Sequence, residues 1–151
     1  MQKVNLGELP DMVGVELRIA QIQADRAFKA IRSTEMPSGH YTVLALIGLN
    51  PGLNQSALAR SMHLDRSSMV PILDSFQRSD WTERRRTDGD RRAYAIYLTD
   101  KGQAVLNSAE KKVQVLESHI RQAMGQAKRD NLLALLKEFQ MIITEIEAVK
   151  G

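Results

Sequence analysis

Five arginines are concentrated in the stretch ERRRTDGDRRAYAIYLTDKG, which spans residues 83–102. They form two groups, Arg84 to Arg86 and Arg91 to Arg92, on either side of the turn-forming pair Asp88-Gly89. Guanidinium groups are permanently charged and match the geometry of phosphate oxygens, so such a cluster could hold a polyanion. A run of charges is also typical of a merely solvated face, and the acidic residues of the stretch offset most of the arginine charge. Whether these arginines bind a polyanion or only form a solvated face therefore depends on the structural elements that carry them.

Other side chains that carry out chemistry are scarce in this chain. Cysteine is absent, which excludes disulfides, thiolate zinc sites and thiol-based redox sensing. The three histidines are widely spaced and form no ligand motif, and neither a nucleophile elbow nor a phosphate-binding loop is present. We therefore expect no catalytic residues, no metal site, no cofactor and no enzymatic activity.

The bulk composition points to one globular domain. The chain has 151 residues and a formal net charge of +3, a basic excess too mild to indicate a nucleic-acid partner by itself. No apolar run approaches the roughly 18 residues that would span a bilayer. The first residues also lack the apolar centre of a secretory signal. We therefore expect a cytoplasmic protein that has no membrane partner.

Hydrophobic periodicity predicts four helices in the first half of the chain. A long helix is expected from about Asp11 to Ser33, and a shorter apolar helix from about 40 to 49. Asn54 is expected to cap a third helix through Met62. Asp65 is expected to cap a fourth over 66–78. Only about three residues separate the last two helices, which is typical of a helix-turn-helix.

A β-hairpin and two long helices are expected after the helix-turn-helix. Residues 81–86 and 92–98 are β-type runs on either side of Asp88-Gly89, which predicts a hairpin. Thr99 can cap a long helix that ends near Gly125, and a last helix follows over about 128–149. The apolar stripe of that last helix, from Leu132 to Ile146, is wider than one small domain needs. It predicts a dimer interface, with an intramolecular core as the alternative.

The stretch LDRSSMVPILDSFQRSDWTERRRTDGDRRAYAIYLTDKG resembles the signature region of the MarR family of bacterial transcription regulators. DGDRRA at the hairpin and YLTDKG at the next helix carry most of the resemblance, and the helices before and after also fit the family's plan. The resemblance implies a mainly α fold with a small β-hairpin wing (α+β), a winged helix-turn-helix flanked by dimerisation helices. Residues 1–151 would form a single regulator chain, with dimerisation helices at 1–35 and 126–151, a DNA-binding lobe at 38–100 and a connecting helix at 100–125.

The predicted recognition helix, residues 66–78, has one face that could enter a DNA groove. At about 100° per residue, Met69, Ile72, Leu73 and Phe76 fall inside and Ser67, Pro71, Asp74 and Arg78 fall opposite. Small hydroxyl and apolar groups on such a face can meet base edges in the major groove. For the serines of the first turn, Ser67 and Ser68, the alternative to a DNA contact is an ordinary solvated helix start. Pro71 lacks a backbone N–H and therefore removes the helical hydrogen bond to the Ser67 carbonyl. It either offers an apolar surface to a base or is a tolerated irregularity of the helix.

The resemblance also implies roles in the wing. Arg92 would enter the minor groove while Asp90 braces the hairpin, and an arginine suits a narrow, negative groove. The other wing arginines would contact phosphates or pair with Asp90. The alternative, for Arg84 especially, is that the side chain only stabilises the wing. Asp80-Trp81 stands where the family usually has Gly-Leu, so the turn before the wing could differ. The predicted DNA-binding residues are Arg66, Ser67, Ser68, Pro71, Arg78, Arg84, Arg86, Asp90, Arg91 and Arg92.

The function implied by the resemblance is a ligand-responsive transcriptional regulator. It would be a repressor that binds a pseudo-palindromic operator in double-stranded DNA as a homodimer and is released by a small anionic or aromatic effector, such as an aromatic acid or its CoA thioester. Two alternatives remain open, a winged-helix module for protein–protein contact and a constitutive DNA-binding protein without an effector. For each effector candidate the alternative is solvation or ordinary packing. The effector candidates are Arg18, Arg26, Arg32, His40 and Tyr41.

Overall fold

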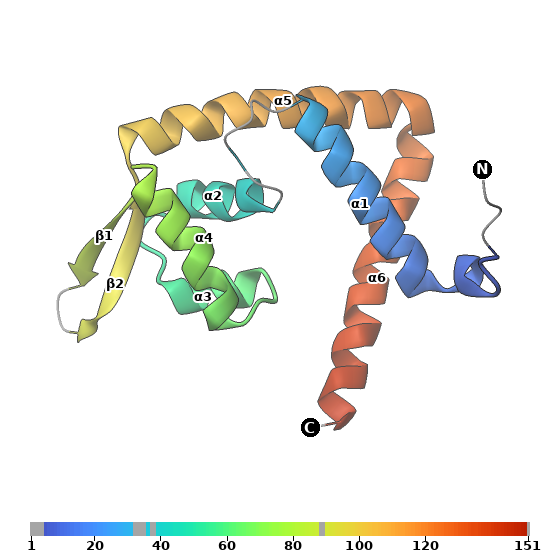
Figure 1. Cartoon of the computed structure of the whole chain (residues 1–151), viewed down its shortest axis with the longest axis horizontal. Helices are drawn as coiled ribbons and strands as arrows, with labels where there is room; N and C mark the ends of the chain where they lie inside the picture. Colours follow the sequence, from blue (N-terminus) through green and yellow to red (C-terminus); the bar gives the residue numbers. More distant parts are fainter. Residues whose placement is uncertain (1–4, 32–35, 37–38, 88–89, 151) are drawn as a thin grey trace. The chain divides into compact units, whose positions relative to one another are not determined.

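The computed structural model is mostly helical, with one two-stranded antiparallel hairpin (Figure 1). It describes residues 5–31, 36, 39–87 and 90–150, and for residues 30, 31, 87, 90–93 and 150 it describes the backbone alone. The chain divides into two compact units, residues 1–112 and 113–151. The elements, in chain order, are η1 (Leu9–Asp11), α1 (Val13–Ile31), α2 (His40–Leu49), α3 (Gln55–Ser61), α4 (Arg66–Arg78), β1 (Thr82–Thr87), β2 (Asp90–Leu98), α5 (Asp100–Met124) and α6 (Gln126–Lys150).

Most helix bounds agree with those predicted. The ranges of α2 and α4 are as predicted, and α3 lies within its predicted range. The predicted start of α1 at Asp11 is wrong, because Asp11 belongs to the 3-10 turn η1 and the helix begins at Val13. Its predicted end at Ser33 lies outside the described residues. α6 begins two residues earlier than predicted, directly after Gly125, whose φ of 77° gives the left-handed conformation that ends α5.

The core of the first unit is built by α2, α3, α4, the start of α5 and Ile96 of β2. Figure 1 shows these helices gathered beside the hairpin. α2 is apolar on all sides and contributes three buried residues, so it lies at the centre of this core. The predicted inner face of α4 is confirmed, because Met69, Leu73 and Phe76 are buried and Ile72 packs against the core. The fully buried large side chains of the core are Val43, Leu44, Ile47, Leu58, Met69, Leu73, Phe76 and Ile96.

Local hydrogen bonds hold the helix-turn-helix in place. The Asn54 side chain accepts a hydrogen bond from the Ala57 N–H at 2.9 Å, so the predicted cap of α3 is confirmed. At the joint, His63 has a φ of 51° and the Leu64 N–H donates to the Ala59 carbonyl at 2.9 Å. Asp65 occupies the N-cap position of α4, but its side chain makes no capping hydrogen bond, so that prediction is wrong. The Asp65 backbone carbonyl instead accepts from the Ser68 N–H.

The wing is an antiparallel pair in which side chains alternate between two faces. Arg84 pairs with Ile96 and Arg86 with Tyr94 on one face, whereas Arg85 lies on the other. The backbone of Ile96 also exchanges hydrogen bonds of 2.9 and 3.0 Å with Gly52 and Leu53, so the loop before α3 is joined to the wing. The predicted turn at Asp88-Gly89 lies outside the described residues.

The junction of the wing and α5 explains the sequence LTDKG in physical terms. The Thr99 hydroxyl donates to the Asp80 carbonyl at 2.6 Å and accepts from the Gly102 N–H at 2.9 Å, which confirms the predicted cap. Asp80 has a φ of 59°, so the turn adopts the conformation that glycine favours although aspartate stands there. A Cβ atom on Gly102 would lie only 1.9 Å from the Trp81 carbonyl oxygen. Glycine is therefore required where α5 crosses the start of the wing.

The second unit comprises the end of α5 and all of α6. The two helices are joined by an ion pair between Arg129 Nη2 and Glu117 Oε2 at 2.9 Å. α6 leaves a broad set of apolar side chains at least one-third exposed in the single chain. These are Leu132, Leu133, Leu135, Met141, Ile142, Ile143, Ile146 and Val149.

Candidate nucleic-acid interface

The outer face of α4 carries the side chains that the sequence predicted for it. Met69, Leu73 and Phe76 are buried on the opposite face, so the helix cannot rotate without exposing the core. The helix continues through Pro71 as far as Arg78. The residues of α4 predicted to contact DNA are all exposed, namely Arg66, Ser67, Ser68, Pro71 and Arg78.

Arg84 of the wing is bound to the recognition helix. Its Nη2 atom donates to Asp74 Oδ1 of α4 at 2.8 Å, and the two side chains are 31% and 43% exposed. An ion pair this exposed contributes about 0.2–1 kcal/mol, so its main effect is on orientation. This contact supports the interpretation that Arg84 stabilises the position of the wing, and Arg84 also lines the pocket described below.

Arg85 and Arg86 differ in their surroundings because they point to opposite faces. The Arg85 guanidinium forms an ion pair with Glu83 and lies 4.4 Å from the centroid of the Tyr97 ring. Arg86 is exposed on the same face as Arg84. Arg86 is consequently the better placed of the two for contact with a polyanion.

The tip of the wing carries the remaining predicted DNA contacts. Asp90, Arg91 and Arg92 begin strand β2, so their backbone positions are consistent with a wing that projects from the lobe. The roles predicted for their side chains lie outside what the structure describes and stay predictions.

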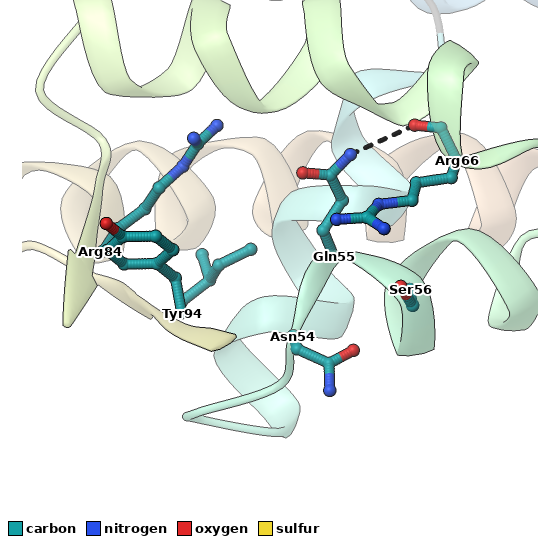
Figure 2. Close-up of a pocket in the computed structure, with 7 residues that line it drawn as sticks. Asn54, Gln55, Ser56, Arg66, Arg84 and Tyr94 are labelled. Carbon is teal, nitrogen blue, oxygen red and sulfur yellow. Dashed lines mark hydrogen bonds between the residues drawn. The ribbon is translucent and has the colours of Figure 1, made fainter. Parts of the chain in front are cut away.

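A small polar pocket opens between α3, the first turn of α4 and the wing (Figure 2). Its volume is about 160 Å³, and the buried Ile96 side chain contributes to its wall. Figure 2 shows Gln55 between the two arginines, with its amide nitrogen donating to the Arg66 carbonyl at 3.1 Å. The sequence reasoning did not identify Gln55, Ser56 or Tyr94. The polar residues that line the pocket are Asn54, Gln55, Ser56, Arg66, Arg84 and Tyr94.

The predicted effector residues that the structure describes are distributed over α1 and α2. His40 and Tyr41 begin α2, and the His40 ring meets Phe76 of α4 edge-on at a centroid distance of 5.5 Å. Burial, and then the negative charge of Glu110, raises the pKa of Tyr41, so its hydroxyl stays protonated and able to donate at neutral pH. Arg18 and Arg26 are exposed on α1, and Arg32 lies outside the described residues. Effector binding by these five residues stays a prediction.

The described part of the chain contains neither a metal-binding cluster nor a membrane-spanning helix. There, no group of three or more histidine, aspartate or glutamate side chains is arranged to hold a metal ion. No helix among the described residues combines the length and apolarity needed to cross a membrane.

Known proteins resemble this chain over nearly its whole length. A sequence profile of the MarR family matches residues 36–94, which include the helix-turn-helix and most of the wing. A transcriptional regulatory protein for the hcr operon of Thauera aromatica is 35% identical over 133 residues, 87% of this chain and 80% of that protein. The chain belongs to the MarR family. As a MarR-family protein it is a transcription regulator and not an enzyme.

Solved structures extend the likeness of this MarR-family chain to the complete fold. The transcriptional repressor CouR bound to a 23-mer DNA duplex is 30% identical, with a TM-score of 0.83 over 92% of this chain and 99% of CouR. CouR bound to p-coumaroyl-CoA is 28% identical, with a TM-score of 0.82 over 91% of this chain and 98% of CouR. The predicted winged helix-turn-helix is therefore confirmed.

Proposed function

We propose that this MarR-family regulator is a ligand-responsive repressor that binds a pseudo-palindromic operator as a homodimer. The observation that carries the proposal is the likeness to CouR, a repressor solved both with a DNA duplex and with p-coumaroyl-CoA. The exposed face of α4 beside an arginine-bearing wing supports the DNA-binding part. The exposed apolar stripe of α6 supports the homodimer, in which residues 1–35 and 126–151 would dimerise and α5 would connect them to the lobe.

The proposed effector is an aromatic acid or its CoA thioester. Arg18, Arg26 and Arg32 would meet an anionic group of this effector, and His40 and Tyr41 would meet its polar or aromatic part. Because the His40 ring contacts Phe76 on the inner face of α4, a ligand that displaces His40 would act directly on the recognition helix. A change of a few ångströms in the spacing of the two recognition helices would lose contacts in both half-sites.

Operator release by a panel of compounds tests this proposal. We expect at least one aromatic acid or aromatic CoA thioester to release the protein from an operator selected from random duplex DNA, measured by fluorescence anisotropy. Free CoA and an aliphatic acyl-CoA serve as controls. Binding that no member of the panel reduces would favour a constitutive DNA-binding protein, and the absence of duplex binding even at low salt would favour a protein–protein module.

Wing and recognition-helix residues should affect binding differently. Arg92→Ala should lower the affinity for all sequences by about tenfold or more, because a minor-groove arginine contributes mainly electrostatic binding. Ser67→Ala or Ser68→Ala should instead alter base preference, with each lost base contact costing about 1–3 kcal/mol at one operator position. Selection of binding sites with each variant measures both effects. Equal loss of affinity and unchanged preference in all three variants would contradict these assigned roles.

A further inference from the structure

The pocket shown in Figure 2 is lined by hydrogen-bond donors that come from α3, α4 and the wing. Two guanidinium groups, Arg66 and Arg84, line it from different elements, together with the amide of Gln55 and the hydroxyls of Ser56 and Tyr94. Every one of these side chains can donate a hydrogen bond, and among the described residues no acidic side chain lines the pocket. The pocket therefore suits a small group that carries several acceptor oxygens and negative charge.

Two of the donors that line this pocket, Arg84 and Gln55, are held in position by contacts within the protein. Arg84 is fixed by Asp74, and the Gln55 amide is fixed by the Arg66 carbonyl. The pairing of Ile96 with Leu53 and Gly52 joins the wing to the loop that leads into α3. These contacts lower the entropy cost of binding for Arg84 and Gln55, because a ligand does not have to order those two side chains.

We propose that this pocket binds one phosphate group of the DNA backbone, with Arg66 and Arg84 supplying charge and Gln55, Ser56 and Tyr94 supplying further hydrogen bonds. This inference rests on the proposed DNA-binding function and adds a phosphate contact at a defined place between the recognition helix and the wing. Arg66 is followed directly by Ser67 on the exposed face of α4, so a phosphate in the pocket would lie next to the groove that α4 enters. Phosphate contacts at such points set the register of a protein on DNA.

The size of the pocket favours a single phosphate over a complete effector. Its volume of about 160 Å³ is below the roughly 300–1,000 Å³ of pockets that enclose drug-sized ligands. A phosphate of coenzyme A has the same local chemistry as a backbone phosphate, so the experiment has to distinguish the two sources.

Three substitutions in the pocket and one outside it test the assignment. Gln55→Glu is nearly isosteric and places a carboxylate against the bound phosphate, Arg66→Gln removes one charge and Tyr94→Phe removes one donor. Arg60→Gln is the control, because Arg60 is an exposed arginine of α3 that does not line the pocket. We expect at least a tenfold weaker affinity for Gln55→Glu and Arg66→Gln at low salt. For Arg66→Gln, the slope of log K against log[salt] should become shallower by about 0.9 per lost phosphate contact, hence about 1.8 for a symmetric dimer.

A methylphosphonate scan of the operator locates the contact. Neutralising one phosphate at a time should reveal one position per half-site at which the wild type and Arg60→Gln lose affinity. The loss at that position should be smaller in Arg66→Gln and in Tyr94→Phe, because each variant already lacks one contact to that phosphate. If the protein binds duplex DNA with steep salt dependence but no phosphate position gives a different loss in the pocket variants than in the wild type, this inference alone is overturned. A wild type that does not bind duplex DNA would overturn the proposed function itself. Calorimetry with free coenzyme A tests the other source of phosphate. If the wild type binds coenzyme A and Arg66→Gln does not, the pocket binds the effector's phosphate and the DNA assignment is overturned.

Discussion

Replacing Leu135 and Ile142 of α6 with glutamate should convert the regulator to a monomer. The two residues lie seven positions apart, on one side of the helix, and are 53% and 46% exposed in the single chain. Glutamate at these positions costs the single chain little, because the side chains already contact water. In a dimer that buries this stripe, each substitution would bury an unpaired carboxylate, which is strongly destabilising.

The affinity for operator DNA should fall with the dimer. A monomer contacts one half-site, so the affinity should decrease by about 100-fold or more, the lower end of the gain that joining two binding modules provides. Sedimentation equilibrium measures the association state, and fluorescence anisotropy with a selected operator measures the affinity.

A matched control separates the loss of the interface from the added charge. Gln140→Glu together with Thr144→Glu adds the same two negative charges to α6, on the side away from Leu135. This variant should remain a dimer and keep its operator affinity within a few-fold. The dimer assignment is wrong if Leu135→Glu/Ile142→Glu also remains a dimer and binds the operator as the wild type does.

The sequence predicted the helix-turn-helix well because local signals mark its boundaries. Asn50-Pro51-Gly52 ends α2, and Asn54 caps α3 through a hydrogen bond between residues three apart. Such interactions depend on short segments and can be read without knowledge of the fold. Asp65 illustrates the limit, since an aspartate at the N-cap position was expected to bond the first turn of α4 and does not.

The partners of the individual wing arginines could not be predicted from such local signals. Arg84, Arg85 and Arg86 are adjacent in sequence, and their partners depend on the register of two strands and on the position of α4. Arg84 pairs with Asp74, ten residues earlier, while Arg85 lies on Tyr97 across the hairpin. The charges were visible in the sequence, but the pairing is a property of the tertiary structure.

The phosphate-sized pocket was missed for a related reason. Its lining residues come from α3, α4 and both strands of the wing, so they are far apart in the sequence and no short segment contains them all. Gln55 and Ser56 follow a capping asparagine and are ordinary helix-start residues when considered alone. One available signal was the alternation of the second strand, which places Tyr94 and Ile96 on the same face.

Gly102→Ala should destabilise the DNA-binding lobe by about 3 kcal/mol, the upper part of the range for an overpacked core. A Cβ atom at this position would lie 1.9 Å from the Trp81 carbonyl oxygen and 2.7 Å from its carbonyl carbon. Those backbone atoms cannot move away easily, because the Trp81 N–H donates to the Phe76 carbonyl at 2.8 Å and its carbonyl accepts from the Thr99 N–H at 3.0 Å. Alanine would otherwise favour a helix interior by about 1 kcal/mol over glycine, so a large loss would report the clash specifically.

Urea unfolding at fixed protein concentration measures this effect, with Gly14→Ala as the control. Gly14 is also helical, but nothing lies within 4 Å of an added Cβ, so the control should unfold within about 1 kcal/mol of the wild type. A Gly102→Ala protein as stable as the control would contradict the close crossing of α5 and the wing. Because Thr99 and Gly102 join α5 to the turn at Asp80 and Trp81, any displacement of α5 has to be transmitted to the base of the wing. The folded fraction of Gly102→Ala should therefore also bind operator DNA more weakly, since the wing and α4 would no longer be held at the spacing that the wild type presents to each half-site.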